Sequence, residues 1–129
     1  MKSTVTALRM LIRLCGVLLI ILGILFWTGN ALSLIPVHML IGVILVLSLW
    51  ALALIAARAG APTGPVAAAF IWGLIVPILG ATQQSLLPGP AHWIIQVLHL
   101  LVGIAAIGMA EGLGRRIREV NNHQSSVVS

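Results

Sequence analysis

Four long apolar stretches joined by short polar segments leave this chain few ways to fold. Its seven Lys and Arg residues lie before the first stretch, between the second and third, and after the fourth. The segments that join the first stretch to the second and the third to the fourth carry no charge. Short loops rich in Lys and Arg stay on the cytoplasmic side of a membrane. The pattern predicts four membrane spans with both termini in the cytoplasm. The basic residues are Lys2, Arg9, Arg13, Arg58, Arg115, Arg116 and Arg118.

Each apolar stretch has about the length that a helix needs to cross the hydrocarbon core. The predicted spans cover residues 7–27, 34–57, 65–81 and 90–113, and a polar tail covers residues 120–129. Hydrophobic residues make up 60% of the chain and charged residues 7%, too little charge for the surface of a soluble domain. We therefore expect one all-α integral membrane domain, a four-helix bundle in the lipid bilayer of a bacterial-type inner membrane.

The net charge of +5 does not indicate nucleic-acid binding. The basic residues flank apolar spans, where membrane topology and attraction to anionic headgroups account for them. No basic patch is interleaved with aromatic residues, as nucleic-acid recognition requires. We expect no nucleic-acid partner.

Glycines recur with the same spacing in the first and third stretches. Gly16 and Gly23 bound the string Gly-Val-Leu-Leu-Ile-Ile-Leu-Gly, and Gly73 and Gly80 bound Gly-Leu-Ile-Val-Pro-Ile-Leu-Gly. A tandem duplication of a two-helix hairpin would explain the similarity and would give parallel repeats. Chance resemblance between apolar helices is the alternative, and such glycines also serve as contact points between membrane helices.

Histidines in the second and fourth stretches are the best candidates for function. An ionisable residue within a span is costly and usually faces the interior of the bundle. His38 precedes Gly42 by four residues, and His99 precedes Gly103 by the same interval, which places each pair on nearly one helix face. A second register aligns Pro36-Val-His38 with Pro90-Ala-His92. The sequence leaves open whether His92 or His99 lies opposite His38.

Two imidazoles that face each other in a helix bundle can hold haem iron as axial ligands. The porphyrin is a broad, flat plate, so the helices beside it need small residues. The pattern predicts a haem b site with His38 and His99 as metal ligands and His92 as the other candidate. The glycines expected to line it are Gly16, Gly23, Gly42, Gly73, Gly80 and Gly103. The alternative is that each histidine is a hydrogen-bonded packing residue.

Two strings carry a resemblance to known haem proteins. His38-Met39-Leu40-Ile41-Gly42 and Gln96-Val97-Leu98-His99-Leu100-Leu101-Val102-Gly103 resemble the haem-ligand helices of small four-helix membrane b-type cytochromes and of haem A synthase. The resemblance covers these strings and the four-span plan. It implies His38 and His99 as axial ligands, with the glycines as packing partners. The chain differs from haem A synthase in having one bundle and no carboxylate near the outer loop. It is therefore expected to be an electron carrier more than a catalyst.

Other polar residues suggest further chemistry. Gln83, Gln84, Gln96 and His92 cluster towards the outer face, where they could bind the head group of a quinone, or simply form a polar loop. Glu111 lies four residues before Arg115, and we expect these two to form an ion pair on the helix surface.

Three functions fit a chain of this kind. The first is a b-type cytochrome for transmembrane or quinone-linked electron transfer. The second is a cofactor-free structural or interaction subunit of a larger membrane complex, with a closed core and hydrogen-bonded histidines. The third, a small multidrug-type transporter, is disfavoured because the first span has no carboxylate to couple protons to a cation.

Overall fold

The computed structural model describes residues 1–128, and these residues form a bundle of four long helices without a β-strand. All four are long and apolar enough to cross a membrane, which confirms the predicted helical fold. One single-turn 3-10 helix leads into α2, and another follows α3. The elements are α1 (Lys2–Trp27), η1 (Leu32–Leu34), α2 (Ile35–Arg58), α3 (Thr63–Thr82), η2 (Gln83–Ser85) and α4 (His92–Val128).

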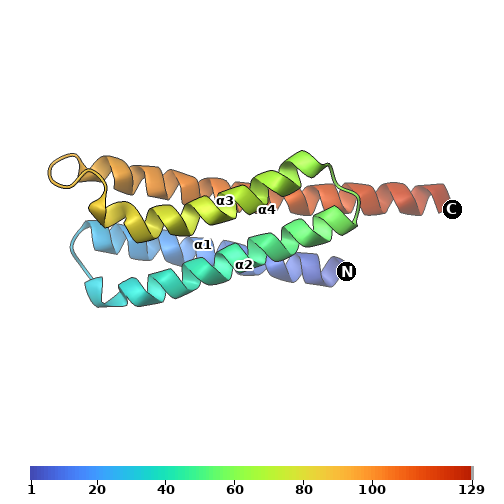
Figure 1. Cartoon of the computed structure of the whole chain (residues 1–129). Coiled ribbons are helices and arrows are strands. Elements are labelled where there is room, and N and C mark those ends of the chain that lie inside the picture. The colour runs from blue at the N-terminus through green and yellow to red at the C-terminus, as the bar shows by residue number, and fades with distance from the viewer. Residues whose placement is uncertain (129) are drawn as a thin grey trace.

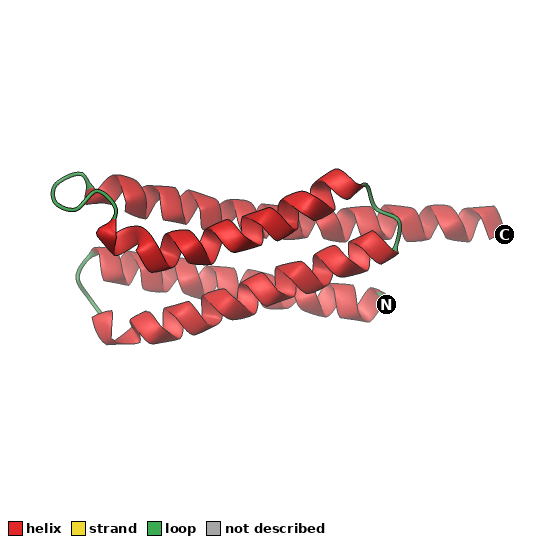
Figure 2. Ribbon diagram, viewed as in Figure 1, coloured by secondary structure: helices red, strands yellow, loops and turns green. Residues whose placement is uncertain are grey.

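The helices run up and down the bundle, so its two ends differ (Figure 1). One end, called the basic end here, holds both chain ends, the link from α2 to α3 and the Lys and Arg residues. The opposite end, called the neutral end, holds the links from α1 to α2 and from α3 to α4, which Figure 2 shows as loops. Each helix contacts the next along the chain, and α1 contacts α4. Helices α2 and α4 also touch across the diagonal, whereas α1 and α3 make no contact within the described residues.

Two helices extend further at the basic end than hydropathy predicted. Helix α1 begins at Lys2, and α4 continues to Val128, so the predicted polar tail is helical up to that residue; Ser129 lies outside the described residues. Packing explains the difference, since Val5 of α1 and Ile117 of α4 are both buried in the same core. The two helices support each other past the expected limits of the spans.

The turns follow from local sequence. Pro36 lies in the first turn of α2, where its missing N–H costs no helical hydrogen bond. In the link after α2, Gly60 adopts a φ of +85°, a left-handed conformation that glycine reaches without strain.

The core is packed unevenly along the bundle. Most buried side chains lie near its middle or towards the basic end, including the fully buried Leu49, Leu52 and Leu113. In the half towards the neutral end, α4 contributes the buried Ile95 and Val102, and Leu45 of α2 is buried at about the same depth as Val102. Nearer the neutral end than Val102, Ile95 is the one buried hydrophobic side chain of the described residues. The two histidine-bearing segments therefore lie in the less densely packed half.

Glu111 joins α4 to α1 near the basic end. Arg13 donates from Nε to Oε1 at 2.7 Å and from Nη2 to Oε2 at 3.0 Å, and Arg9 donates to Oε2 as well. The expected pair with Arg115 is wrong. The reason is that Glu111 faces the groove between α1 and α4, where two guanidinium groups already lie, and Arg115 is exposed.

We expect Glu111→Gln to lower the midpoint of thermal unfolding in detergent by about 5 °C, because two arginines lose their shared counter-charge. Differential scanning fluorimetry would measure it. Glu119→Gln is the matched control, since Glu119 makes no ion pair with residues 1–128. An equal loss of stability in both variants would contradict this role for Glu111.

Candidate cofactor site between α2 and α4

Two imidazoles meet across the diagonal of the bundle in its neutral half. The ring of His38 on α2 and the ring of His99 on α4 have centroids 6.3 Å apart and planes inclined by 47°. Both side chains are partly buried. Each continues the inward-facing stripe of its helix, because Leu45 and Leu49 of α2 and Ala106 of α4 follow at helical spacing and are buried.

Neither imidazole makes a hydrogen bond to a described residue. No nitrogen of His38 or His99 has a hydrogen-bond partner within residues 1–128, and the Nδ1 atom of each ring is buried. A buried polar atom without a partner costs about 1–3 kcal/mol. This departs from the hydrogen-bonded histidines expected of a cofactor-free core.

The structure pairs His38 with His99, not with His92. His92 is the first residue of α4, and its Nδ1 lies 3.1 Å from the carbonyl oxygen of Leu86 in the adjoining loop. The register depends on η1, which adds a helical turn before α2 and starts the span at Leu32. His38 then lies almost as far from the start of its span as His99 lies from the start of α4.

The six candidate glycines differ in their surroundings. Gly16 and Gly73 are contact points, since a Cβ atom would lie 2.4 Å from Ile107 and 2.2 Å from Trp50, respectively. By contrast, a Cβ on three of the six candidates, Gly23, Gly42 and Gly103, would meet no atom within 4 Å. The same is true of Gly108 and Gly112 in α4, which were not candidates.

Open space therefore lies beside three of the six glycines. Gly42 and Gly103 are each one turn from a histidine on the same face, and Gly23 is on α1. Contact glycines bring helices together, but these three leave room. At these positions the helices present backbone without a neighbouring side chain.

Two aromatic side chains near the histidine pair were not among the residues predicted from the sequence. Phe26 of α1 meets His38 edge-on, with centroids 5.4 Å apart. Trp72 of α3 donates from Nε1 to the carbonyl oxygen of Val102 at 2.9 Å, which ties α3 to α4 one turn from His99. Helical spacing gives one signal for Phe26, since it follows Gly23 by three residues. The partner of Trp72 depends on how two helices are rotated, which spacing does not give.

Gly80, the remaining candidate glycine, sets the position of His99. A Cβ atom at Gly80 would lie 3.0 Å from Cε1 of the imidazole, so any larger residue there would displace the ring. The first and third helices thus both contact the histidine pair, through Phe26 and Gly80.

The two rings are close neighbours. Their centroids lie 6.3 Å apart, and imidazole nitrogens are common ligands of metal ions and of haem iron. Within the described residues, no three His, Cys, Asp or Glu side chains lie together, so these residue types offer a pair of ligands here and not the set of a tetrahedral zinc site.

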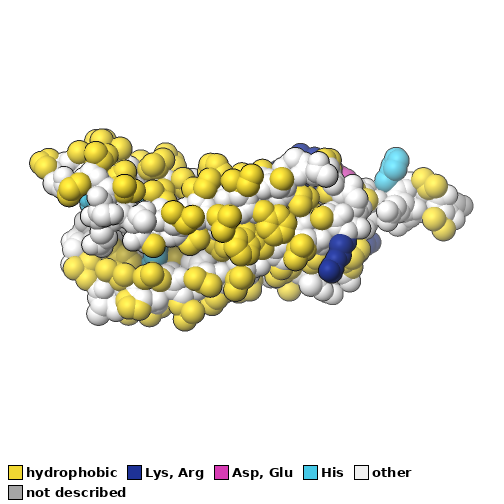
Figure 3. Space-filling view, in the orientation of Figure 1, with side chains coloured by type: hydrophobic (Ala, Val, Ile, Leu, Met, Phe, Trp, Pro, Cys, Tyr) yellow, Lys and Arg dark blue, Asp and Glu magenta, His cyan; other side chains and the backbone are white. Residues whose placement is uncertain are grey.

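The histidine region is reached from the side of the bundle. Figure 3 shows histidine atoms set back between the side chains of α2 and α3 towards the neutral end, where the surface is hollowed. The Lys and Arg side chains on this face lie towards the basic end. The surroundings of the histidines are therefore apolar and uncharged.

The remaining candidates lie apart from the pair. Gln83 and Gln84 are in η2, and the partly buried Gln96 is on α4. His123 is exposed on the last part of α4. The glutamines and His92 thus remain at the neutral end, where η2 contacts α4, but no hydrogen bond joins their side chains within the described residues.

The chain was compared with protein families, with curated proteins and with solved structures. No protein-family model, curated protein or solved structure matches the chain.

Proposed function

We propose that this chain is a membrane b-type cytochrome that binds one haem between His38 and His99 and carries electrons. In this proposal the four helices span an inner membrane of bacterial type. The basic end faces the cytoplasm, in keeping with the distribution of Lys and Arg. The resemblance of the two histidine-glycine strings to membrane cytochromes and haem A synthase points the same way.

One observation carries the proposal: two imidazoles without a hydrogen-bond partner among the described residues lie 6.3 Å apart in the less densely packed half of the bundle. A structural histidine pair would be expected to use its nitrogens in hydrogen bonds. Here the nitrogens have no partner among the described residues, and open space lies beside Gly23, Gly42 and Gly103. These features together favour a ligand over a packed core.

Each residue near the histidine pair has a separate role in this proposal. His38 and His99 would supply the axial nitrogens, and Phe26 and Gly80 would fix the ring positions. Trp72 would hold α3 against α4. The haem, when bound, supplies a one-electron couple, and the apolar neighbours exclude water from it. With both axial positions taken by imidazole, the site favours electron transfer over binding of a small substrate.

The redox partner is proposed to meet the chain at the neutral end, because the histidine pair lies there. A quinone is one candidate, since Gln83, Gln84 and His92 offer polar atoms near that membrane surface. A neighbouring subunit of a membrane complex is the other. Loss of electron transfer from reduced quinone in Gln83→Leu, with the haem spectrum retained, would support the quinone.

A visible spectrum tests the haem proposal directly. We expect protein purified in mild detergent with added hemin to show a sharp Soret band that shifts on reduction with dithionite, with narrow α and β bands. One haem per chain is expected by pyridine haemochrome assay. A featureless spectrum after hemin addition, from protein with the expected helical circular dichroism, would overturn the proposal and favour the cofactor-free subunit.

A further inference from the structure

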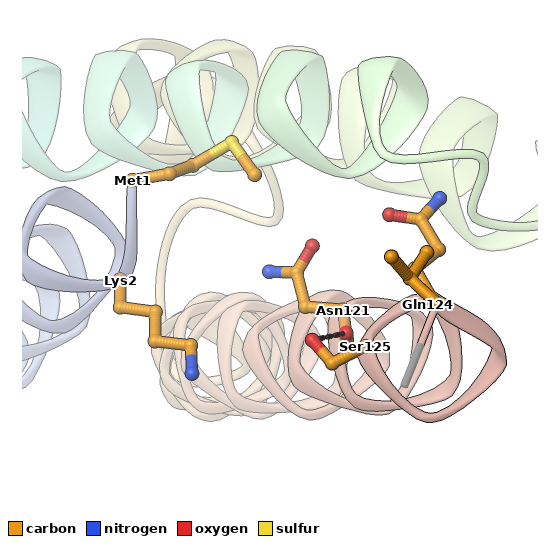
Figure 4. Close-up of a pocket in the computed structure, with 6 residues that line it drawn as sticks. Met1, Lys2, Asn121, Gln124 and Ser125 are labelled. Atoms are coloured by element: carbon orange, nitrogen blue, oxygen red, sulfur yellow. Dashed lines mark hydrogen bonds between the residues drawn. The ribbon is translucent and has the colours of Figure 1, made fainter.

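The groove between the start of α1 and the end of α4 is a second place where function is expected. It is lined by Met1 and Lys2 on one side and by residues of α4 on the other, and its volume is about 660 Å³. Figure 4 shows Lys2 on one margin of the groove and Asn121, Gln124 and Ser125 on the other. Val128 completes the lining.

The groove is a regular continuation of the packing between α1 and α4. Gly16 of α1 lies against Ile107 of α4. Seven residues closer to the basic end on both helices, Arg9 lies against Gly114. Another seven residues lead to Lys2 and Asn121, which line the groove together. A seven-residue repeat keeps the same faces of two helices together. The groove is therefore a continuation of the interface between α1 and α4.

The side chains in the groove are hydrogen-bond donors without partners. The Lys2 ammonium and the amides of Asn121 and Gln124 make no side-chain hydrogen bond or ion pair with residues 1–128. Glu119 lines an adjoining groove with His123, and Gln124 lines both grooves. A donor-rich groove with one cationic side chain and no acidic side chain in its lining suits an anionic oxygen group such as a phosphate.

The position of the groove relative to the membrane indicates which phosphate-bearing molecule could reach it. One heptad corresponds to about 10 Å along a helix, so Lys2 and Asn121 lie about that far beyond the contact of Arg9 with Gly114. The polar headgroup layer begins about where the hydrocarbon core ends and is several ångströms deep. If Arg9 lies at the edge of the core, the groove lies among the headgroups.

Three exposed arginines surround α4 just before the groove. Arg115, Arg116 and Arg118 point away from the bundle, while Ile117 between them is buried against it. None of the three forms an ion pair with another described residue. Juxtamembrane cations of this kind attract anionic lipids, each contributing about 1 kcal/mol.

We propose that the groove between Lys2 and Asn121 binds the phosphate headgroup of an anionic phospholipid in the cytoplasmic leaflet. Lys2 supplies the charge, and the amides of Asn121 and Gln124 supply directed donors. The arginines at positions 115, 116 and 118 raise the local concentration of anionic lipid. The bound lipid would stabilise the junction of α1 with the extended part of α4.

Lipid retention measured by native mass spectrometry tests this site. Protein in mild detergent is incubated with equal amounts of phosphatidylglycerol and phosphatidylcholine. We expect wild-type protein to retain phosphatidylglycerol preferentially, and Lys2→Gln/Asn121→Ala to lower this retention by about fivefold, the equivalent of one lost cationic contact. Asn122→Ala is the matched control, because Asn122 is exposed and does not line the groove; its retention should equal that of the wild type.

Three results would overturn the assignment. They are equal retention of the two lipids by the wild type, unchanged retention in the double variant, or displacement of the lipid by millimolar inorganic phosphate. Gln124→Ala provides a second variant if the double variant does not fold. The haem spectrum of all these variants should match the wild type, so the lipid site and the haem site can fail separately.

Discussion

His99→Ala is expected to abolish the low-spin haem spectrum, and His38→Ala to do the same. Each substitution removes one of two axial ligands, and the partner imidazole alone cannot keep the iron six-coordinate with nitrogen on both faces. Each variant is measured by reduced-minus-oxidised spectra after hemin addition at equal protein concentration. We expect the narrow α band to disappear in both cases, leaving at most a weak five-coordinate spectrum.

The matched control for this experiment is His92→Ala. His92 lies at the start of α4 with its Nδ1 against the Leu86 carbonyl, so its loss should leave the spectrum unchanged. His123→Ala, an exposed site on α4, controls for histidine content. If His92→Ala removes the α band and His99→Ala does not, the pairing of His38 with His99 is not the haem site.

Gly73→Ala is expected to destabilise the bundle more than any other single methyl group added to a span glycine. The new Cβ atom would lie 2.2 Å from Nε1 of Trp50 and 3.0 Å from two further indole atoms. The indole is rigid, and moving it breaks its hydrogen bond to the carbonyl oxygen of Phe70. Overpacking of this kind costs about 1–3 kcal/mol. Thermal unfolding in detergent, followed by Trp fluorescence, would measure the loss.

Gly42 supplies the control for that substitution. A Cβ atom there meets nothing within 4 Å, and alanine favours a helix over glycine by about 1 kcal/mol, so Gly42→Ala should be as stable as the wild type. Gly42→Leu should also fold, but it should bind less haem because its side chain enters the open space near His38. Similar unfolding midpoints for Gly73→Ala and Gly42→Ala would mean that Gly73 is not a helix contact.

Hydropathy and charge were enough to predict four helices, since these signals are local in the sequence. The rotation and register of the helices were not predictable in the same way. Whether His92 or His99 meets His38 depends on one helical turn, and η1 (Leu32–Leu34) provides it. Glu111 likewise pairs with Arg9 and Arg13, which are about a hundred residues away in the sequence. A local i, i+4 rule could only suggest Arg115.

The glycines illustrate the same limit. Their spacing is equal in α1 and α3, yet Gly16 and Gly73 are contact points, whereas Gly23 faces open space and Gly80 faces an imidazole. Spacing places glycines on one stripe of a helix, but the neighbouring helix decides what the stripe meets. The sequence could therefore propose the histidines, with His92 and His99 as alternatives, but it gave no way to find the contacts made by Phe26 and Trp72.

The off-centre position of the histidine pair has an electrical consequence. His99 is seven residues into α4, about 10 Å from the neutral end. In the proposed membrane arrangement this is about a third of the way through a hydrocarbon core of about 30 Å. A charge that crosses the whole membrane at 100 mV changes in energy by about 2.3 kcal/mol. An electron that reaches the proposed haem from the neutral side would cross only about a third of that field. Its apparent midpoint potential against an external mediator should shift by about 30 mV per 100 mV of membrane voltage.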